Sequence, residues 1–352
     1  MNFSFYKIFF NLLSLFEFLK KEKLFGRRNF SLKKLKLLSK GFYSLGQVPF
    51  DFKNYKYSDF ISDLENIKLS YLNYPYGRLL RDKLVFSLFF KNYCNVPEIY
   101  ALISKGKINP VDKNFIQISL DLIIELLENN TLIMKPRFGT SGQGIIKIEK
   151  INHNFYKLNQ TIIDINYLKD FIGSLDDYIV VRFIKQGNFA ERFFAESTNT
   201  IRITTFSDPN SFKGKILYAL MRFGTKKSIP VDNVGSGGIY ATIDIETGKL
   251  DTAIELFENG RFVCHTEHPE TKVQIKDVQI PKWQEIKNNF IQLSTLISPY
   301  IKFAGWDIIL TNDKYYLIEG NNGPDLYIQG PDKPLALDDS FINFLKTNDV
   351  RN

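Results

Sequence analysis

The sequence predicts an α+β protein, with helices in its first third and mainly antiparallel strands after residue 130. Three observations support this expectation. Apolar residues recur at helical spacing over residues 82–93 and 115–128. From residue 131 onward, short apolar or alternating stretches are separated by turn residues. No repeat or low-complexity tract interrupts the 352 residues, a length that accommodates two or three lobes. The predicted strands are 131–134, 145–149, 178–184, 200–206, 215–223 and 239–244, followed by a helix over 283–298 and a hairpin over 304–321.

The first 21 residues predict an amphipathic helix with a narrow polar stripe. Ser4, Lys7, Asn11, Ser14 and Lys21 recur at spacings of three, four and seven, and apolar residues fill most other positions. The apolar run is too short to cross a membrane, and no small-residue cleavage site follows it. Two interpretations remain open: a helix packed in a domain or dimer interface, and a helix lying on an anionic cytoplasmic leaflet.

Basic residues are concentrated in residues 1–40. This segment holds ten Lys or Arg against two acids, a net charge of +8, whereas the other 312 residues are balanced at 36 against 36. No recognised nucleic-acid motif accompanies it, so no nucleic-acid partner is expected. The two cysteines lack a paired spacing, which indicates a reducing compartment, the cytoplasm. His265 and His268 are expected on the surface rather than in a zinc site.

A glycine-rich loop joins the first two predicted strands. Its sequence is Gly139-Thr140-Ser141-Gly142-Gln143-Gly144. Such a loop supplies N–H groups and hydroxyls that can fold over phosphates. Lys135, at the end of the preceding strand, can place a positive charge beside the same phosphates.

The hairpin over residues 304–321 carries Asp307, Glu319 and Asn321. Because side chains alternate along antiparallel strands, these three can project from one face. Two carboxylates and a carboxamide suit Mg²⁺, which takes oxygen ligands and completes its shell with water and nucleotide phosphates. Trp306 is expected in the core.

Three further residues are candidates for substrate contact. Arg202 lies between two isoleucines that would face a core, so its guanidinium is expected to face a cleft. Arg222 has an equivalent position in the next strand. Guanidinium groups bind carboxylates and phosphates bidentately, which predicts that both arginines hold an acidic substrate. Asn233, in a glycine-rich loop, is predicted to hydrogen-bond the substrate.

The lysine-proline strand, the glycine-rich loop and the Asp…Glu-Gly-Asn hairpin, in this order, resemble the ATP-grasp superfamily over residues 70–335. The segments 197–202, 221–224, 232–238 and 305–307 resemble, more narrowly, its sugar-transfer-associated branch. The resemblance implies a nucleotide held between two α+β lobes. The expected organisation is a basic, helical N-terminal region over 1–73, an N-terminal lobe over 74–130, a small lobe with the glycine-rich loop over 131–186, and a large lobe with the metal site over 187–352.

The resemblance also implies roles for individual residues. Lys83 and Lys135 would contact the phosphates of ATP, and Asp307, Glu319 and Asn321 would bind Mg²⁺. The residues expected beside the adenine are Arg182, Phe183 and Ile184. No glutamate follows that strand directly, so the candidates for the ribose are Glu191 and Glu196.

Several members of the superfamily carry an arginine two residues before the first metal aspartate. This sequence has Gly305 there, which strengthens Arg202 and Arg222 as residues that contact the acid substrate. Asp325 is the candidate for contact with an incoming amine.

The activity implied is that of an ADP-forming carboxylate-amine ligase. The γ-phosphoryl group of ATP would pass to a carboxylate, and an amine would attack the resulting acylphosphate to give an amide. The branch implies a sugar acid or glycan precursor, in the biosynthesis of capsule or other cell-surface polysaccharide. Two alternatives remain open: an amino-acid or peptide ligase, and a non-catalytic nucleotide-binding regulatory protein. A homodimer and a peripheral position on the inner face of the cytoplasmic membrane also remain open.

Overall fold

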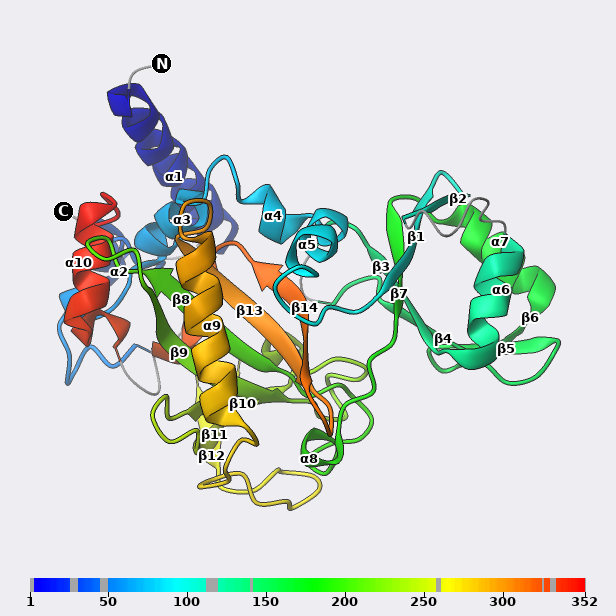
Figure 1. Cartoon of the computed structure of the whole chain (residues 1–352). Coiled ribbons are helices and arrows are strands. Elements are labelled where there is room, and N and C mark those ends of the chain that lie inside the picture. The colour runs from blue at the N-terminus through cyan, green and yellow to red at the C-terminus, as the bar shows by residue number, and fades with distance from the viewer. Residues whose placement is uncertain are drawn as a thin grey trace.

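The computed structural model describes residues 3–25, 31–44, 50–111, 120–139, 142–257, 261–324, 326–329 and 334–351. Two seven-stranded sheets form its framework, and their strand pairs are antiparallel (Figure 1). The expected α+β class is therefore confirmed.

The first sheet and the two helices packed on it form one lobe. Its core contains Ile123 and Leu127 from α6 (Leu120–Asn129) and Leu168 and Ile172 from α7 (Ile165–Ser174). Its strands, in spatial order, are β2 (Lys107–Pro110), β1 (Ile99–Ser104), β7 (Tyr178–Arg182), β3 (Leu132–Pro136), β4 (Ile146–Lys150), β5 (Phe155–Leu158) and β6 (Thr161–Asp164).

The second sheet is larger and is covered on both faces. On one face α9 (Trp283–Ile297) packs Phe290 close to Trp306, which lies in the core as expected. On the other face α10 (Asp339–Thr347) packs Phe341 and Phe344 against Phe206. Its strands, in spatial order, are β12 (Phe262–His265), β11 (Leu250–Leu256), β10 (Ile239–Ile243), β9 (Gly214–Phe223), β8 (Ile201–Ser207), β13 (Phe303–Leu310) and β14 (Tyr315–Asn321).

Short helices connect the two sheets with the N-terminal region. Asp82 caps α5 (Lys83–Phe90) by accepting hydrogen bonds from the backbone N–H groups of Leu84 and Val85. Ser62 and Glu65 form a capping box that begins α3 (Asp63–Tyr71). The remaining helices are α1 (Phe3–Phe25), α2 (Leu32–Ser39), α4 (Arg78–Arg81) and α8 (Asn188–Glu191).

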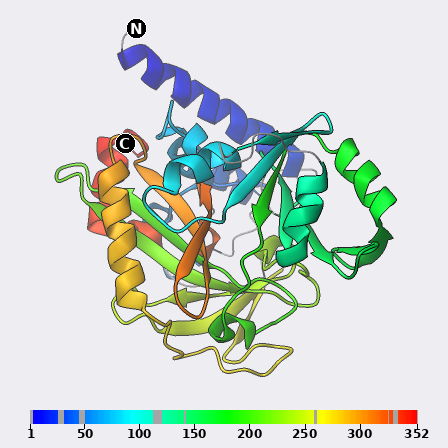
Figure 2. The ribbon, with the colours of Figure 1, turned by 45° about the vertical axis from the view of Figure 1, so that its right-hand side comes forward.

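The helix α1 lies on the outside of the molecule, as both views show (Figure 1, Figure 2), and it packs on α3. Phe10 contacts the ring of Tyr71, and Phe18 stacks on Tyr43. In the part of the chain that the structure describes, no helix combines the length and the apolar character that a bilayer-spanning segment needs.

The predicted strands are confirmed to within two residues, and the structure adds elements that the sequence pattern did not reveal. The strands β1 and β2 lie in the stretch expected as a separate N-terminal lobe, yet β1 pairs with β7 in the first sheet. Part of the helix expected over 115–128 falls outside the described residues, and the rest is α6.

One expectation was wrong. His268 is fully buried and does not lie on the surface. Burial is possible because protein groups provide the hydrogen bonds that its ring would otherwise make with water. Its Nε2 lies 2.9 Å from the carbonyl oxygen of Gly224, and its Nδ1 lies 3.3 Å from the amides of Glu270 and Thr271. Burial lowers the pKa of the imidazole. His265 is partly buried beside Glu255.

Candidate functional site

The register of the β13–β14 hairpin places the predicted metal ligands on one face. Asp307 is directly opposite Glu319, and Gly305 is opposite Asn321. Directly paired residues share a face, as do residues two apart along a strand. The Nδ2 atom of Asn321 lies 3.5 Å from an Asp307 carboxylate oxygen.

Two arginines bind the Asp307 carboxylate. Arg202 pairs with Asp307 across β8 and β13 and binds it bidentately, with Nη2 at 2.9 Å from Oδ2. The Nη2 atom of Arg222 lies 3.1 Å from the same oxygen and donates to Thr200 Oγ1 at 2.6 Å. Burial raises the pKa of Asp307, but the charges of and hydrogen bonds from the two arginines outweigh it, so the pKa falls to about 2. The carboxylate is thus ionised at every physiological pH.

The glycine two residues before Asp307 makes room for Arg202. A Cβ atom at Gly305 would lie 3.2 Å from Arg202 Cδ and 2.8 Å from Pro324 Cβ. Arg202 therefore places its guanidinium next to Asp307 from the neighbouring strand, and a side chain at position 305 would displace it.

Two lysines approach Glu319 from different elements. Lys83, at the start of α5, donates to the carbonyl oxygen of Gly139 at 2.7 Å and lies 3.7 Å from Glu319 Oε1. Lys135, on β3, donates to the carbonyl oxygen of Ile318 on β14 at 3.4 Å. Lys135 thus reaches from the first sheet to the second. The candidate site therefore lies where the two sheets meet.

Burial changes the charge equilibrium of Lys135. Desolvation, with a smaller contribution from the charge of Lys83, lowers its pKa to about 8, and the opposite charge of Glu319 offsets only part of this. A phosphate beside this amine would favour its charged form.

The pair of Asp82 and Arg137 fixes the two lysines relative to each other, and sequence reasoning missed it. Arg137 follows β3 and donates from Nε and Nη2 to Asp82 at 2.8 and 2.6 Å. The backbone N–H of Lys83 donates to the carbonyl oxygen of Arg137 at 3.1 Å. The available signal was the acid before an apolar helical stretch, a pattern typical of a helix cap. Its partner, 55 residues away, had no local signal.

The glycine-rich loop needs glycine for conformation and for space. Gly139, Gly142 and Gly144 have φ values of +117°, +72° and +73°. A Cβ atom on Gly142 would lie 3.0 Å from the side chain of Val231, in a loop that precedes β10 of the second sheet. The loop thus also spans the boundary between the sheets. Gln143 is exposed, and the predicted contacts of Thr140 and Ser141 lie outside the described residues.

The segment expected beside the adenine leaves β7 and leads to the second sheet. The backbone N–H of Phe183 donates to Thr131 at 2.9 Å, so protein already uses this amide. Lys147 Nζ lies 4.6 Å from the Phe183 ring centre. Ile184 is buried, whereas Arg182 is exposed. Of the two ribose candidates, Glu191 pairs with Lys185 at 3.4 Å and Glu196 is exposed.

Contacts within the protein do not test the remaining substrate candidates. Asn233 Oδ1 accepts from the backbone N–H of Gly235 at 3.1 Å, which is a local turn contact. Its contact with substrate stays a prediction. Asp325 lies outside the described residues.

The donor set fits a magnesium ion that arrives with a nucleotide. No group of three or more His, Cys, Asp and Glu side chains suited to a metal ion occurs among the described residues. Around the site, Lys83, Lys135, Arg202 and Arg222 face Asp307, Glu319 and the nearby Asp232, which leaves a net charge of +1. Each carboxylate oxygen has two lone pairs, so a carboxylate bound to arginine can still ligate a metal. A cationic site with few protein ligands favours the ion when phosphate oxygens accompany it.

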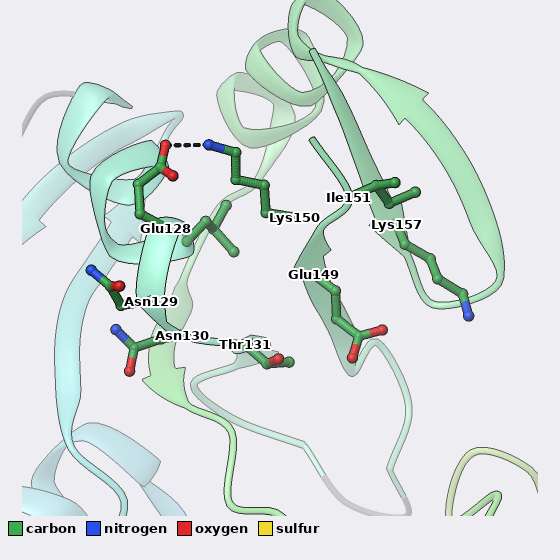
Figure 3. A pocket seen from close by; sticks show the side chains of 9 residues that line it. Glu128, Asn129, Asn130, Thr131, Glu149, Lys150, Ile151 and Lys157 are labelled. Atoms are coloured by element: carbon green, nitrogen blue, oxygen red, sulfur yellow. Dashed lines mark hydrogen bonds and ion pairs between the residues drawn. The ribbon is translucent and has the colours of Figure 1, made fainter. Parts of the chain in front are cut away.

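An open pocket of about 410 Å³ lies elsewhere, between the end of α6 and the strands β4 and β5 (Figure 3). Its lining is polar, and Lys150 forms an ion pair across it with Glu128 (Figure 3). It contains none of the candidate site residues.

Comparisons with known proteins identify similar chains. A family model described as sugar-transfer associated ATP-grasp matches residues 66–337. No curated protein matches the sequence.

Solved structures with similar folds include three ligases. The D-alanine–D-alanine ligase from Bacillus anthracis, complexed with ATP, is 12% identical, with 80% of this chain and 69% of that chain covered and a TM-score of 0.41. The D-alanine–D-alanine ligase from Helicobacter pylori is 13% identical, with coverages of 77% and 61% and a TM-score of 0.43. The L-amino acid ligase from Bacillus licheniformis is 12% identical, with coverages of 70% and 41% and a TM-score of 0.36.

Proposed function

Because the chain belongs to the sugar-transfer-associated ATP-grasp family, we propose that it is an ATP-dependent carboxylate-amine ligase that forms an amide through an acylphosphate. The observation that carries this proposal is the convergence of Lys83 and Lys135 on Glu319, beside the Asp307 carboxylate and its two arginines. Cations from both sheets and oxygen donors from one hairpin suit a polyphosphate with its metal ion.

In this proposal the two lysines hold the phosphates of ATP. Glu319, Asn321 and Asp307 would hold Mg²⁺, which when bound neutralises charge on the phosphates during transfer. Arg202 fixes the orientation of Asp307 through its bidentate contact. The glycine-rich loop would close over the phosphates with its backbone N–H groups.

Arg202 and Arg222 provide the positive charge for the acid substrate. The two guanidinium groups meet at Asp307, so a carboxylate placed there would lie beside two cations. The same charges would stabilise the negative charge of an acylphosphate, which lowers the barrier to its formation. No side-chain nucleophile is required, since the amine substrate performs the second attack.

The substrates we propose are a sugar acid or glycan precursor and an amine, in the assembly of capsule or another cell-surface polysaccharide. This part rests on the sugar-transfer association of the family. The cytoplasm is the proposed compartment, because it supplies ATP and keeps thiols reduced, and both Cys94 and Cys264 are free thiols.

The test is nucleotide turnover with pooled substrates. The protein is incubated with Mg-ATP, a pool of uronic acids and a pool of amines, and nucleotide products are separated. ADP release that requires both pools supports the proposal, and Glu319→Gln is the inactive control. ADP release without either pool would favour a phosphatase-like or regulatory protein, and AMP would exclude the acylphosphate route. Turnover with amino acids alone would favour the amino-acid ligase.

A further inference from the structure

The outer side of α1 carries a continuous apolar surface. Leu12 and Phe16 are 63% and 65% exposed, far more than is usual for large apolar side chains on a folded domain. Four more exposed side chains follow the same helical spacing on this face: Ile8, Phe9, Leu15 and Leu19. The helix has 23 residues and is thus about 34 Å long. We call the surface formed by these six residues the α1 face.

The opposite side of α1 is fixed to the protein, so the α1 face cannot simply rotate inward. Ser14 is fully buried and donates to the carbonyl oxygen of Phe10 at 2.7 Å. Phe18 is 3% exposed and stacks on Tyr43, with ring centres 5.0 Å apart. The described part of the polar stripe therefore turns partly inward, and the apolar side turns to solvent.

The acidic residues of this region also point inward. The Glu22 carboxylate accepts from the backbone N–H of Ser44 at 3.0 Å and from its hydroxyl. Burial raises the pKa of Tyr71 to about 12, and a hydrogen bond to Glu17 adds to the rise. Both acids of residues 1–40 are thus used within the protein.

Basic residues of the N-terminal region, in contrast, stay exposed. Lys20 and Lys21 are exposed at the C-terminal end of the α1 face, and Lys36 and Lys40 are exposed on and after α2. The surface therefore combines the apolar α1 face with neighbouring positive charge, and α1 exposes no acidic side chain. This combination is typical of a helix that lies in the interface of an anionic bilayer.

A groove beside α1 extends the same surface. It has a volume of about 260 Å³ and is lined by Phe9, Phe10, Leu13, Ser70, Tyr71, Tyr74 and the exposed Arg81. Phe9 belongs to both the groove and the α1 face. Mostly apolar walls with one cation suit a lipid acyl chain and its anionic headgroup.

We propose that the α1 face binds an anionic lipid surface. A second copy of the chain is the competing occupant. In a symmetric dimer the same patch pairs with itself, so Lys20 and Lys21 of one copy would find no exposed acid on the α1 of the other. The acids that could compensate are turned inward, so charge favours the lipid. The proposal does not depend on the ligase activity, since it rests on α1 and the residues beside it.

The test uses the full chain and vesicles of phosphatidylglycerol and phosphatidylcholine, with pure phosphatidylcholine as the comparison. The only two tryptophans, Trp283 and Trp306, are buried, so Phe16→Trp introduces an exposed reporter on the α1 face. A blue shift of its emission on anionic vesicles, with quenching by brominated lipid, is expected. Unchanged emission on these vesicles at low salt would overturn the proposal.

Sedimentation with the same vesicles measures affinity. Leu12→Glu should weaken binding at least about tenfold, since it removes a buried leucine from the bilayer. Each of Lys20→Gln and Lys21→Gln should weaken it about fivefold, and less at high salt. Leu296→Glu is the matched control, because Leu296 is 61% exposed on α9 and should not affect binding. Concentration-dependent dimers that Leu12→Glu abolishes, together with no vesicle binding by the parent protein, would assign the face to a second copy instead.

Discussion

The affinity for ATP should fall steeply between pH 8 and pH 10, because the amine of Lys135 loses its proton in this range. Burial holds its pKa near 8 in the free protein, whereas the ordinary pKa of a lysine is 10.5. Phosphate oxygens beside the amine favour the charged form and raise the pKa in the complex. Binding in this window therefore takes up a proton.

The direction and the size of this change in ATP affinity follow from the linkage between ATP binding and proton binding. Well below pH 8, Lys135 is charged in both states, so this group adds no pH dependence. Between the free and the bound pKa, each pH unit lowers affinity by up to tenfold. If the bound pKa returns to about 10.5, the loss from pH 8 to 10 is about 40-fold. Above the bound pKa the amine is neutral in both states, and the dependence ends.

Isothermal titration calorimetry with a non-hydrolysable ATP analogue measures both quantities. Repeating the titration at pH 9 in buffers of different ionisation enthalpy gives the number of protons taken up, expected to approach one. Lys135→Met should remove this uptake and flatten the pH profile. Adenosine, which has no phosphate, should bind equally to both proteins.

The stability of the free protein also depends on pH through Lys135. The folded pKa of Lys135 lies below its unfolded value, so the unfolded chain binds more protons between pH 8 and 10.5. Its contribution to stability is therefore greatest above this window and is lost as pH falls through the folded pKa. Lys135→Met should accordingly unfold at no lower urea concentration than the parent at pH 7. An affinity that is constant from pH 8 to 10, or proton uptake that survives Lys135→Met, would refute this account of the lysine.

Three further predictions concern the neighbouring residues. Glu319→Gln should lower turnover at least about a hundredfold while adenosine binding persists, and unchanged turnover of the parent in EDTA would contradict a magnesium role. Arg202→Ala should destabilise the protein by about 3–5 kcal/mol in urea unfolding, since it leaves Asp307 as a buried charge with a weaker set of partners; a loss below 1 kcal/mol would show that Arg222 suffices. Gly305→Ala should cost about 1–3 kcal/mol through contact with Pro324 and Arg202, and an unchanged urea midpoint would show that both yield freely.

The strands of the second sheet could be predicted because their signals are local. Apolar residues and turn residues define β13 and β14, and alternation alone places Asp307 and Glu319 on one face. The binding of Asp307 by Arg202 could not be predicted in the same way. It depends on the register between β8 and β13, which brings these two residues together across 105 positions.

Other features depend on tertiary partners and gave weak local patterns. The strand β2 has four mostly exposed residues, so only its pairing with β1 defines it. His268 is buried because the carbonyl group of Gly224, 44 residues away, satisfies one nitrogen of its ring and nearby amides satisfy the other. In α1, Ser14 is buried although polar residues usually lie at the surface. Burial is possible because its hydroxyl donates to a carbonyl oxygen of its own helix.

The position of α5 has a consequence for exchanging parts between family members. Leu80 and Phe86 pack where Gly320 of β14 lacks a side chain, at 2.7 and 2.8 Å from the position of a Cβ atom. The same segment is bonded to the first sheet through Asp82 and Arg137. A chimera cut between the lobes would therefore divide an element that belongs to both. A recombinant with altered substrate choice needs residues 78–90, 135–137 and 318–320 from a single parent, whatever the origin of the rest.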